Sequence, residues 1–340
     1  MSGEDPVNPL LERLEPQVKE LLERIPQPPF REPMLATLAR RGPTGRGWVF
    51  ERKLDGERCL ACREGPQVRL ISRTGHLRNA TYPELADALL AQQEDDFIAD
   101  GEIVAFRGQN TSFSRLQERI GITDPEIARG SGAPVFLYLF DLLYLDGYGL
   151  TRLPLLARKE ILEHAFPFRD PLRYHPHTDR NWEAFYGDAC RMGWEGVVAK
   201  RAAGHYTSGR TTEWLKLKCI GRQEFVIGGF TEPRGGRAGF GALLLGYYEN
   251  GKLLYAGRVG TGFDERMLLD LAGELARRET AASPFSDRRM RERGEHWVTP
   301  DLVCEVAFAE WTPDHRLRQP RFVGLRTDKA AADVIREMPG

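Results

Sequence analysis

The chain has 340 residues, 41% of them hydrophobic, and its 48 basic and 49 acidic side chains give a formal net charge of −1. This length suits two domains, and this hydrophobic content can build packed cores, which excludes global disorder. No apolar run approaches the roughly 20 residues that a membrane-spanning helix needs, and the acidic start of the chain lacks the pattern of a secretory signal.

The first 29 residues are predicted to form a helical leader. Apolar residues recur at helical spacing between residues 7 and 25, which indicates an amphipathic helix. They are Leu10, Leu14, Val18, Leu21, Leu22 and Ile25. Prolines at positions 26, 28, 29 and 33 then indicate a short stiff linker. The leader could pack on the next domain or be the tail of an upstream linker.

Residues 30–220 are predicted to form an α+β domain with antiparallel sheets, because strands and helices alternate without a βαβ pattern. Residues 48–53, 58–63 and 68–72 are typical of an antiparallel meander, with turns at Asp55-Gly56 and at residues 64–66. The further predicted elements are a helix over 82–92 with Leu85, Leu89 and Leu90 on one face, strands over 97–106, 135–145 and 196–200, and a helix over 182–192.

Residues 221–340 are predicted to form a small closed β-barrel of the OB-fold class. Glycine-rich turns separate its expected strands, which lie at 225–230, 242–248, 253–259, 302–311 and 322–325. One helix, over 267–277, interrupts them.

Five cysteines are scattered at positions 59, 62, 190, 219 and 304. Their odd number and their spacing predict reduced cytosolic thiols rather than a disulfide framework. Cys59 and Cys62 form the only close pair, but no second pair of Cys or His lies at ligand spacing, so we do not expect a zinc site.

The near-neutral charge does not indicate a nucleic-acid-binding protein, for which a basic domain is usual. Any contact with a polyanion must therefore use local patches. The candidates are the cluster Arg288, Arg289, Arg291 and Arg293 and the series Arg316, Arg318, Arg321 and Arg326. For the first cluster, ordinary solvated surface is the alternative.

The run from Glu51 to Arg58 contains the most informative residue, Lys53. A lysine side chain is protonated at neutral pH, and it becomes a nucleophile when desolvation or another cation makes the charged form costly. A buried strand end precedes Lys53, Asp55 can hold a sugar hydroxyl, and Gly56 lets backbone approach a ligand. The alternative is a surface lysine before a turn, since Asp-Gly is a common hairpin signal.

Other polar groups occupy the ends of apolar strands, where buried polar atoms need a purpose. Asp100-Gly101-Glu102 and Glu195-Gly196 place carboxylates there, and two acids from separate strands suit Mg²⁺. The segment 214–218 alternates strictly, so Lys216 and Lys218 share one strand face and suit bound phosphates. Alternatively, each acid pairs with a nearby arginine, and the two lysines protect an edge strand from aggregation.

In chain order, these segments resemble the signature segments of the covalent nucleotidyltransferase superfamily, which comprises ATP-dependent DNA ligases, RNA ligases and mRNA capping enzymes. The matching segments are Lys53-Leu54-Asp55-Gly56, Ser72-Arg73-Thr74-Gly75, Asp100-Gly101-Glu102, Phe140-Asp141-Leu142-Leu143, Glu195-Gly196-Val197-Val198-Ala199-Lys200, Trp214-Leu215-Lys216-Leu217-Lys218 and Arg326-Thr327-Asp328-Lys329. The resemblance covers about residues 30–330.

Within that superfamily the chain most resembles the ligase module of bacterial end-joining DNA ligases, which work with Ku. The segments that carry this likeness are 33–36, 112–117, 234–241 and 308–313. Two features depart from the pattern. Leu54 stands where an aromatic residue is frequent, and the leader does not look like the large DNA-clamping domain of replicative ligases.

The resemblance implies a role for each matching residue. Lys53 would carry AMP from ATP, Glu51 would read the adenine amino group, and Phe140 would stack on the base. Arg58 and Glu102 would hold the ribose, Arg73 and Lys200 would contact a 5′-phosphate, and Lys216 and Lys218 would neutralise the α-phosphate. Glu102 and Glu195 would hold Mg²⁺ or Mn²⁺. Asp328 and Lys329, supported by Arg326, would orient pyrophosphate.

The resemblance also implies a substrate and a setting. We expect a monomer that seals nicked or broken double-stranded DNA in non-homologous end joining, in the bacterial cytoplasm at the nucleoid. Ku and polymerase or nuclease modules are the expected partners, and no membrane is expected. The alternatives are an RNA ligase, a GTP-using capping enzyme, or an inactive nucleic-acid-binding module that contains an OB-fold.

Overall fold

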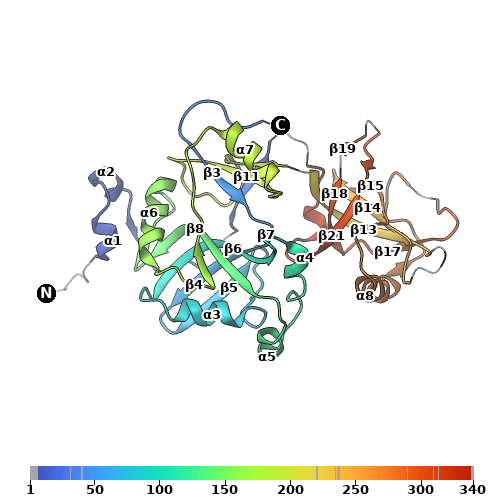
Figure 1. Ribbon diagram of the computed structural model, residues 1–340, viewed down its shortest axis with the longest axis horizontal. Helices are drawn as coiled ribbons and strands as arrows, with labels where there is room; N and C mark the ends of the chain where they lie inside the picture. Colours follow the sequence, from blue (N-terminus) through green and yellow to red (C-terminus); the bar gives the residue numbers. More distant parts are fainter. Residues whose placement is uncertain are drawn as a thin grey trace. The chain divides into compact units, whose positions relative to one another are not determined.

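The computed structural model describes residues 7–30, 32–39, 41–219, 221–233, 235, 238–288, 290–308, 310–312 and 314–337. Contacts within the chain divide it into two compact units, residues 1–219 and residues 220–339. Each unit has its own hydrophobic core. Figure 1 labels many of the elements of both units.

The large sheet of the first unit is mostly antiparallel. Its described strands are, in order across the sheet, β1 (Glu23–Arg24), β9 (Tyr148–Gly149), β8 (Val135–Leu145), β6 (Asp96–Arg107), β4 (Glu57–Glu64) and β5 (Gln67–Ser72). Two short strands extend it: β10 (Leu172–Tyr174) pairs in parallel with β8, and β7 (Asn110–Thr111) pairs with β6.

The small sheet of the first unit corrects the predicted meander. Its described strands are, in order, β2 (Met34–Leu38), β12 (Gly209–Lys218), β11 (Gly196–Arg201) and β3 (Trp48–Lys53). Because β3 pairs with β11 and not with β4, Asp55-Gly56 carries the chain from one sheet to the other and is not a hairpin turn. Gly56 lies so close to β6 that an added Cβ would be 2.2 Å from the Ile103 carbonyl oxygen.

Helices cover the outer faces of the two sheets (Figure 1). One core cluster joins the large sheet to α3 (Pro83–Leu90), α4 (Phe113–Leu116) and α6 (Leu155–Ala165), and α5 (Pro125–Arg129) lies against α3. The helix α7 (Trp182–Arg191) packs on β3 and β11. Leu85 and Leu89 of α3 share a buried face, but the prediction that Leu90 lies on the same face is wrong, because its side chain is 45% exposed.

The inner faces of the two sheets share a third apolar cluster. Leu60 and Phe140 of the large sheet pack there with Met34 and Trp214 of the small sheet. Side chains alternate along a strand, so the residues of β3, β11 and β12 that do not face α7 point toward the large sheet.

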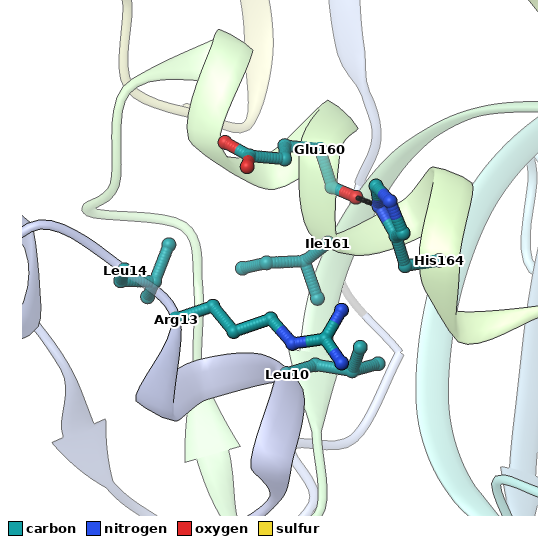
Figure 2. Close-up of a pocket in the computed structure, with 6 residues that line it drawn as sticks. All are labelled: Leu10, Arg13, Leu14, Glu160, Ile161 and His164. Atoms are coloured by element: carbon teal, nitrogen blue, oxygen red, sulfur yellow. Dashed lines mark hydrogen bonds between the residues drawn. The ribbon is translucent and has the colours of Figure 1, made fainter.

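The leader packs on the first unit, but it is not one helix. It forms α1 (Pro9–Glu12), α2 (Pro16–Lys19) and the strand β1, which pairs with β9. Pro16 lacks an N–H and begins a new helix, which breaks the predicted continuous one. Figure 2 shows Leu10 and Leu14 facing Ile161 of α6 across a cavity of about 60 Å³, which is too small for a nucleotide.

The second unit contains an antiparallel sheet and the helix α8 (Glu265–Ala276), whose Leu268, Leu271 and Leu275 are buried. The described strands of this sheet are β13 (Gly221–Thr231), β14 (Leu243–Glu249), β15 (Lys252–Val259), β16 (Glu279–Thr280), β17 (Glu295–Val298), β18 (Val303–Phe308) and β21 (Arg321–Arg326). The strands β19 (Glu310–Trp311) and β20 (Leu317–Arg318) pair with each other in a separate two-stranded sheet, and a 3-10 turn lies at Ala331–Asp333.

The long strand β13 allows this sheet to curl. It pairs with β18 along its first half and with β14 and β17 along its second half. The Phe322 N–H of β21 donates to the Thr261 carbonyl just beyond β15, at 2.9 Å, which brings the two ends of the sheet together. The predicted strand 302–311 is divided into β18 and β19, and the short strands β16, β17 and β20 were not predicted.

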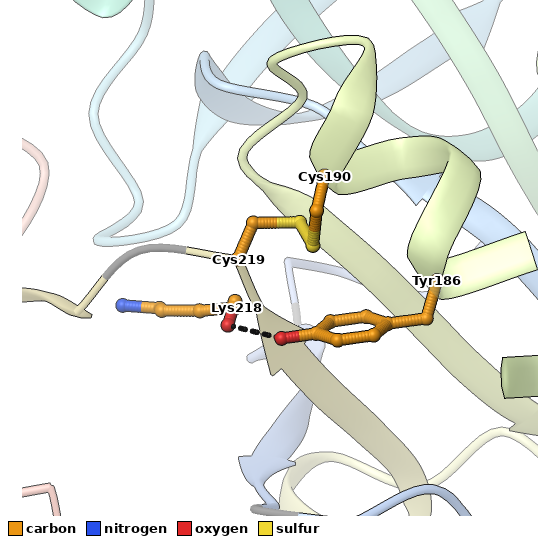
Figure 3. The surroundings of a disulfide bond; sticks show 4 residues. All are labelled: Tyr186, Cys190, Lys218 and Cys219. Carbon is orange, nitrogen blue, oxygen red and sulfur yellow. Dashed lines mark hydrogen bonds between the residues drawn. A yellow bond between two sulfur atoms is a disulfide. The ribbon is translucent and has the colours of Figure 1, made fainter.

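The prediction that all five cysteines are reduced thiols is wrong. Cys190 of α7 and Cys219, the residue after β12, form a disulfide, and beside it the Tyr186 hydroxyl donates to the Lys218 carbonyl at 2.9 Å (Figure 3). Packing of α7 on the small sheet brings the two Cα atoms within 5.2 Å, a proximity that sequence spacing does not reveal. Cys59, Cys62 and Cys304 are free and buried.

Across the described residues, no helix has the length and apolar character needed to cross a membrane.

Candidate active site

The predicted nucleophile lies at the end of β3, on the inner face of the small sheet. Lys53 is opposite Gly196 of β11, which is in turn opposite Lys218 of β12. The next row along the same face holds Glu51, Val198 and Lys216, and the one after it holds Val49, Lys200 and Trp214. Since β12 lies between β2 and β11, it is not an edge strand, and the edge-protection interpretation of its lysines is wrong.

Lys53 forms an ion pair with Glu195, the residue just before β11. The Lys53 Nζ lies 2.6 Å from Glu195 Oε2. The Glu195 side chain is only 3% exposed, whereas that of Lys53 is 22% exposed. The amine is therefore held in place and remains accessible from one side.

Glu51 is clamped between two lysines. Its Oε1 accepts from Lys159 Nζ of α6 at 2.7 Å, and its Oε2 lies 2.7 Å from Lys200 Nζ. Burial alone would raise the pKa of Glu51, but the two ammonium groups outweigh burial and lower it to about 2. Burial lowers the pKa of Lys200 to about 8, against the opposing effect of Glu51. Glu51 is therefore an ionised acceptor, and Lys159 is a residue of the site that was not predicted.

The Phe140 ring lies beneath two cations. Lys200 Nζ is 4.2 Å from its centroid and the Arg58 guanidinium carbon is 4.7 Å away, while Trp214 packs edge-on at 6.0 Å. Lys200 also lies 4.1 Å from the centroid of Trp214. Cations are attracted to aromatic faces, so Phe140 and Trp214 form a platform that is covered by cations. An aromatic ligand can stack on this platform only if one of the cations moves away.

Arg58 makes a bidentate contact with Asp100. Its Nε and Nη2 donate to the two carboxylate oxygens at 2.6 and 2.5 Å, and the Tyr206 hydroxyl donates to the same carboxylate at 2.6 Å. Asp100 is therefore the strand acid that pairs with an arginine, as the alternative interpretation held. Glu102 lies opposite Arg58 in the sheet, and its Cγ would be 3.0 Å from a Cβ added at Gly56. Glu102 thus lies beside the segment that follows Lys53.

Asp55 and Arg73 lie at the margin of this arrangement. Asp55 is buried, and its Oδ2 accepts from the Phe113 N–H at 3.2 Å, so its carboxylate supports the start of α4. Arg73 is half-buried in the turn after β5. Beside it, Gly75 has a positive φ of 84° and lies under the exposed ring of Phe30.

The residues present fit a divalent cation that is bound together with phosphate groups. In the described part of the chain, no group of three or more His, Cys, Asp or Glu side chains could hold a metal ion by itself. Glu195 and Glu102 nevertheless place carboxylates, the donors that Mg²⁺ prefers, beside Lys53 and the segment that follows it. Mg²⁺ commonly completes its coordination with water and substrate phosphates, so two protein ligands suffice.

In the second unit, Arg326, Asp328 and Lys329 form one charged group. Arg326 donates to both Asp328 oxygens at 2.8 and 2.7 Å and pairs with Glu305, while Lys329 pairs with Glu224 at 3.2 Å. Burial would raise the pKa of Asp328, but Arg326 outweighs it and lowers the pKa. Asp328 and Lys329 are 2% and 9% exposed, so this group is held rigidly by its own unit.

Arginines of both predicted basic patches make contacts within the protein. Arg288 pairs with Glu292 and Glu295 and lies 4.5 Å from the centroid of Tyr255. Arg316 pairs with Asp287 and lies over the same ring. Arg289 lies outside the described residues, as do parts of the end-joining segments 234–241 and 308–313, namely Arg234, Gly236, Arg237, Ala309 and Pro313.

The fold and the site together define a nucleotidyltransferase domain followed by a C-terminal β domain. Comparison with known proteins specifies this further. A model of the ATP dependent DNA ligase domain matches residues 17–218, and a model of the ATP dependent DNA ligase C terminal region matches residues 236–329. The chain belongs to the ATP-dependent DNA ligase family.

Curated relatives and a solved structure agree with that assignment. The chain is 38% identical over 324 residues to the multifunctional non-homologous end joining protein LigD of Pseudomonas aeruginosa, covering 93% of this chain and 38% of the relative. It is 39% identical over 322 residues to the LigD DNA repair protein of Mycobacterium tuberculosis, covering 90% of this chain and 40% of the relative. A structure of mycobacterial DNA ligase D complexed with ATP and MES matches with a TM-score of 0.65 and 37% identity, covering 90% of this chain and 98% of that one. The chain thus spans about two fifths of the length of the curated relatives.

Proposed function

We propose that this chain is an ATP-dependent DNA ligase module that seals nicks or double-strand-break ends in non-homologous end joining. The observation that carries the proposal is the position of Lys53. It lies at a strand end, partly accessible and paired with Glu195, on a sheet face that also carries Lys216 and Lys218. Family membership supports the chemistry, and the LigD relatives, named as end-joining proteins, support the biological role.

Three displacements at phosphorus make up the reaction. Lys53 Nζ attacks the α-phosphorus of ATP, the bond to pyrophosphate breaks, and the amine gives up a proton. A DNA 5′-phosphate oxygen then attacks the same phosphorus, the phosphorus–nitrogen bond breaks, and Lys53 regains a proton. Finally a 3′-hydroxyl gives up its proton and attacks the 5′-phosphorus, the bond from that phosphorus to the AMP oxygen breaks, and AMP leaves.

The first unit supplies the residues that hold ATP. Glu51 accepts from the adenine amino group and Phe140 stacks on the base, a contact worth about 1–3 kcal/mol. Arg58 and Glu102 hold the ribose, with Asp55 in support of that segment. This role for Phe140 requires Lys200 to move off its ring, which frees Lys200 for a phosphate.

The phosphates and the DNA end engage the remaining cations. Lys216 and Lys218 neutralise the α-phosphate, and Arg73 and Lys200 contact the 5′-phosphate. Mg²⁺ or Mn²⁺ held by Glu102 and Glu195 would neutralise charge on the transferring phosphoryl oxygens. Glu195 also holds Lys53 before ATP enters.

The second unit acts on the leaving group. Asp328 and Lys329, supported by Arg326, orient pyrophosphate during the first step. These residues belong to a separate unit, so we propose that it closes on Lys53 for adenylation and then withdraws to let DNA bind. As part of a larger end-joining system, the chain would work as a monomer with Ku and with polymerase or nuclease modules, on the nucleoid in the bacterial cytoplasm.

The test is covalent labelling with α-labelled ATP. We expect an acid-labile, base-stable label on the protein that disappears in Lys53→Ala and persists in Lys252→Ala, a control for an exposed lysine. The labelled protein should then seal a nicked DNA duplex. Persistent labelling of Lys53→Ala would refute the assignment, and labelling by GTP or sealing of nicked RNA alone would favour a capping enzyme or an RNA ligase.

A further inference from the structure

Lys159 is a fully buried lysine whose ammonium group has three protein acceptors. From α6 its Nζ donates to Glu51 Oε1 at 2.7 Å, to the His175 carbonyl at 2.8 Å and to the Phe140 carbonyl at 3.3 Å. Its side chain is 0% exposed. An ammonium group has three N–H donors, so all of them are used by the protein and none is left for a ligand.

The three acceptors come from separate parts of the first unit. Glu51 lies on β3 of the small sheet, Phe140 lies on β8 of the large sheet, and His175 follows β10. One charged group thus ties the two sheets together at the place where their inner faces meet. Stability alone does not explain such an arrangement, because a well-packed apolar side chain of similar volume often stabilises a fold as well as a buried ion pair does.

Lys159 and Lys200 contact Glu51 in different ways. Lys200 lies over the rings of Phe140 and Trp214, at 4.2 and 4.1 Å, where a bound base would displace it. Lys159 contacts the other oxygen of the carboxylate, Oε1, and its ammonium group lies 5.0 Å from the centroid of a different ring, Tyr174. Lys200 is therefore placed to touch a ligand, whereas Lys159 acts on a ligand only through Glu51 and Phe140.

We propose that Lys159 is a positioning residue for recognition of the nucleotide base. It holds the Glu51 carboxylate and the Phe140 backbone at a fixed spacing, so that the edge and the face of one base are read together. This inference rests on the base-binding roles proposed above for Glu51 and Phe140.

The arrangement selects adenine over guanine. Adenine presents an amino donor at position 6, which a carboxylate oxygen accepts, whereas guanine presents a carbonyl acceptor there. Paired with Lys159, Glu51 remains a charged acceptor aimed at that position. Without the lysine, the carboxylate is freer to turn away or to take up a proton, and the discrimination against guanine weakens.

The decisive variant is Lys159→Met, which matches the lysine side chain as far as Cε and removes the charged ammonium group. We expect the KM for ATP in lysyl-AMP formation to rise about tenfold or more, because a site built to hydrogen-bond its substrate depends on aligned partners. The rate at saturating ATP should stay close to that of the wild type, and the preference for ATP over GTP should fall by a similar factor.

Arg119→Met is the matched control. Arg119 is another buried cation, 2% exposed, which pairs with Glu84 at 2.7 Å and donates to the Thr81 carbonyl at 2.7 Å, and it has no contact with the site. Both variants should lower the melting temperature. Only Lys159→Met should change the KM for ATP and the preference for ATP over GTP.

A double-mutant cycle separates positioning from general damage. In a Glu51→Gln background, Lys159→Met should raise the KM for ATP by less than about twofold further, because the charge of Lys159 acts on Glu51 and only its weaker contact with the Phe140 carbonyl remains to be lost. The proposal would be overturned if the increase in KM of the double variant equalled the product of the increases in the two single variants. It would also be overturned by a folded Lys159→Met protein with wild-type KM and wild-type ATP preference.

Two further results complete the test. If Lys159→Met does not fold, Lys159→Gln retains donors for the two carbonyls while losing the charge, and the same changes in KM and preference are expected. If neither variant folds, the need for Lys159 is structural and the proposal is wrong. A wild-type chain that takes no label from ATP refutes the proposed function itself, a result that differs from normal labelling with unchanged Lys159 variants.

Discussion

Two lysine–glutamate ion pairs each have one partner on β3, two residues apart, and they differ in how much of their side chains is exposed to solvent. In the outer pair, Lys53 of β3 meets Glu195 at 2.6 Å with 22% of the lysine side chain exposed. In the inner pair, Glu51 of β3 meets Lys159 at 2.7 Å with the side chains 2% and 0% exposed. The residue types and the distances are nearly the same, so burial is the difference that matters.

Burial determines which of these pairs can open. In the outer pair solvent reaches the lysine, so the ammonium group can leave the carboxylate for a substrate at a lower cost than in a fully buried pair. Removing one partner of a fully buried pair costs about 3–5 kcal/mol, because the other charge is left without compensation. The outer pair therefore suits a nucleophile that must be released and taken back, and the inner pair suits a fixed part of the binding site.

Removal of the outer carboxylate should have the largest effect on activity. In Glu195→Gln, we expect lysyl-AMP formation to slow by on the order of 10²- to 10³-fold, because the amine loses its partner and the phosphates lose a proposed metal ligand. Single-turnover labelling with α-labelled ATP measures that rate. The KM for ATP should change little, since Glu195 pairs with Lys53, whereas the base platform is formed by Phe140 and Trp214.

Glu183→Gln, at an exposed position in the first turn of α7, is the control for this change. It should label at the wild-type rate. An adenylation rate for Glu195→Gln within about fivefold of wild type would show that the outer pair is dispensable and that Lys53 needs no carboxylate beside it.

Loss of the disulfide should have the next largest effect, which is on stability. The disulfide lies next to the backbone that carries Glu195 of the outer pair. The Cys219 N–H donates to the Glu195 carbonyl at 3.0 Å, so the bond between Cys190 and Cys219 anchors the backbone that carries Glu195. It closes a loop with a sequence separation of 29 residues. We expect replacement of both cysteines by serine to lower the free energy of unfolding by about 3 kcal/mol relative to the oxidised protein.

Denaturant unfolding with and without a thiol reductant measures this contribution. The doubly substituted protein should match the reduced wild type, and reductant should not change it. If oxidised wild type, reduced wild type and the double variant all unfold at the same denaturant concentration, the bond makes no contribution to stability.

The sequence predicts most strands well but not how they are paired. The ranges of β3, β8 and α7 follow from local apolar patterns and match their predictions closely. The partner of β3 is β11, more than 140 residues further along, and the Asp55-Gly56 signal next to it pointed to a hairpin instead. Turn signals are local, whereas the choice of sheet depends on which apolar faces can be buried together.

The site also combines residues that the sequence predicts with a residue that only tertiary packing reveals. The order of the signature segments predicted Lys53, Glu195 and Lys216, and the structure places all three on one region of the small sheet. Lys159 was missed, although a signal exists: Arg158 and Lys159 fall at helical spacing between Leu155 and Leu162, in the apolar stripe of α6. Charged residues within an apolar stripe indicate buried partners, but only tertiary packing identifies those partners as Asp141 and Glu51.

The inner pair should also make the stability of the first unit depend on pH, which is the smallest effect expected. His175, 4% exposed, lies beside it with Nε2 at 2.9 Å from the Arg52 carbonyl and 4.0 Å from Glu51 Oε2. Burial lowers the pKa of His175 to about 4, against the opposing effect of Glu51. In the unfolded chain a histidine titrates near 6.5, so between pH 6.5 and 4 the unfolded state binds more protons and stability falls as the pH falls.

Glu51 adds its own loss only at lower pH. Its pKa is lowered from 4.5 to about 2, so the stability it contributes is complete above pH 4.5 and is lost as the pH falls toward 2. Between pH 7 and pH 5 we therefore expect the loss to come mainly from His175 and to be on the order of 1–2 kcal/mol. His175→Gln keeps a donor for the Arg52 carbonyl and removes the titrating ring, so its unfolding free energy should vary less over this interval. His164→Gln, at an exposed position of α6, should retain the wild-type slope. If the unfolding free energy of wild type and of His175→Gln varied equally with pH, the surroundings of the inner pair would take up protons as readily when folded as when unfolded. The contrast in burial between the two pairs would then have no consequence for protonation.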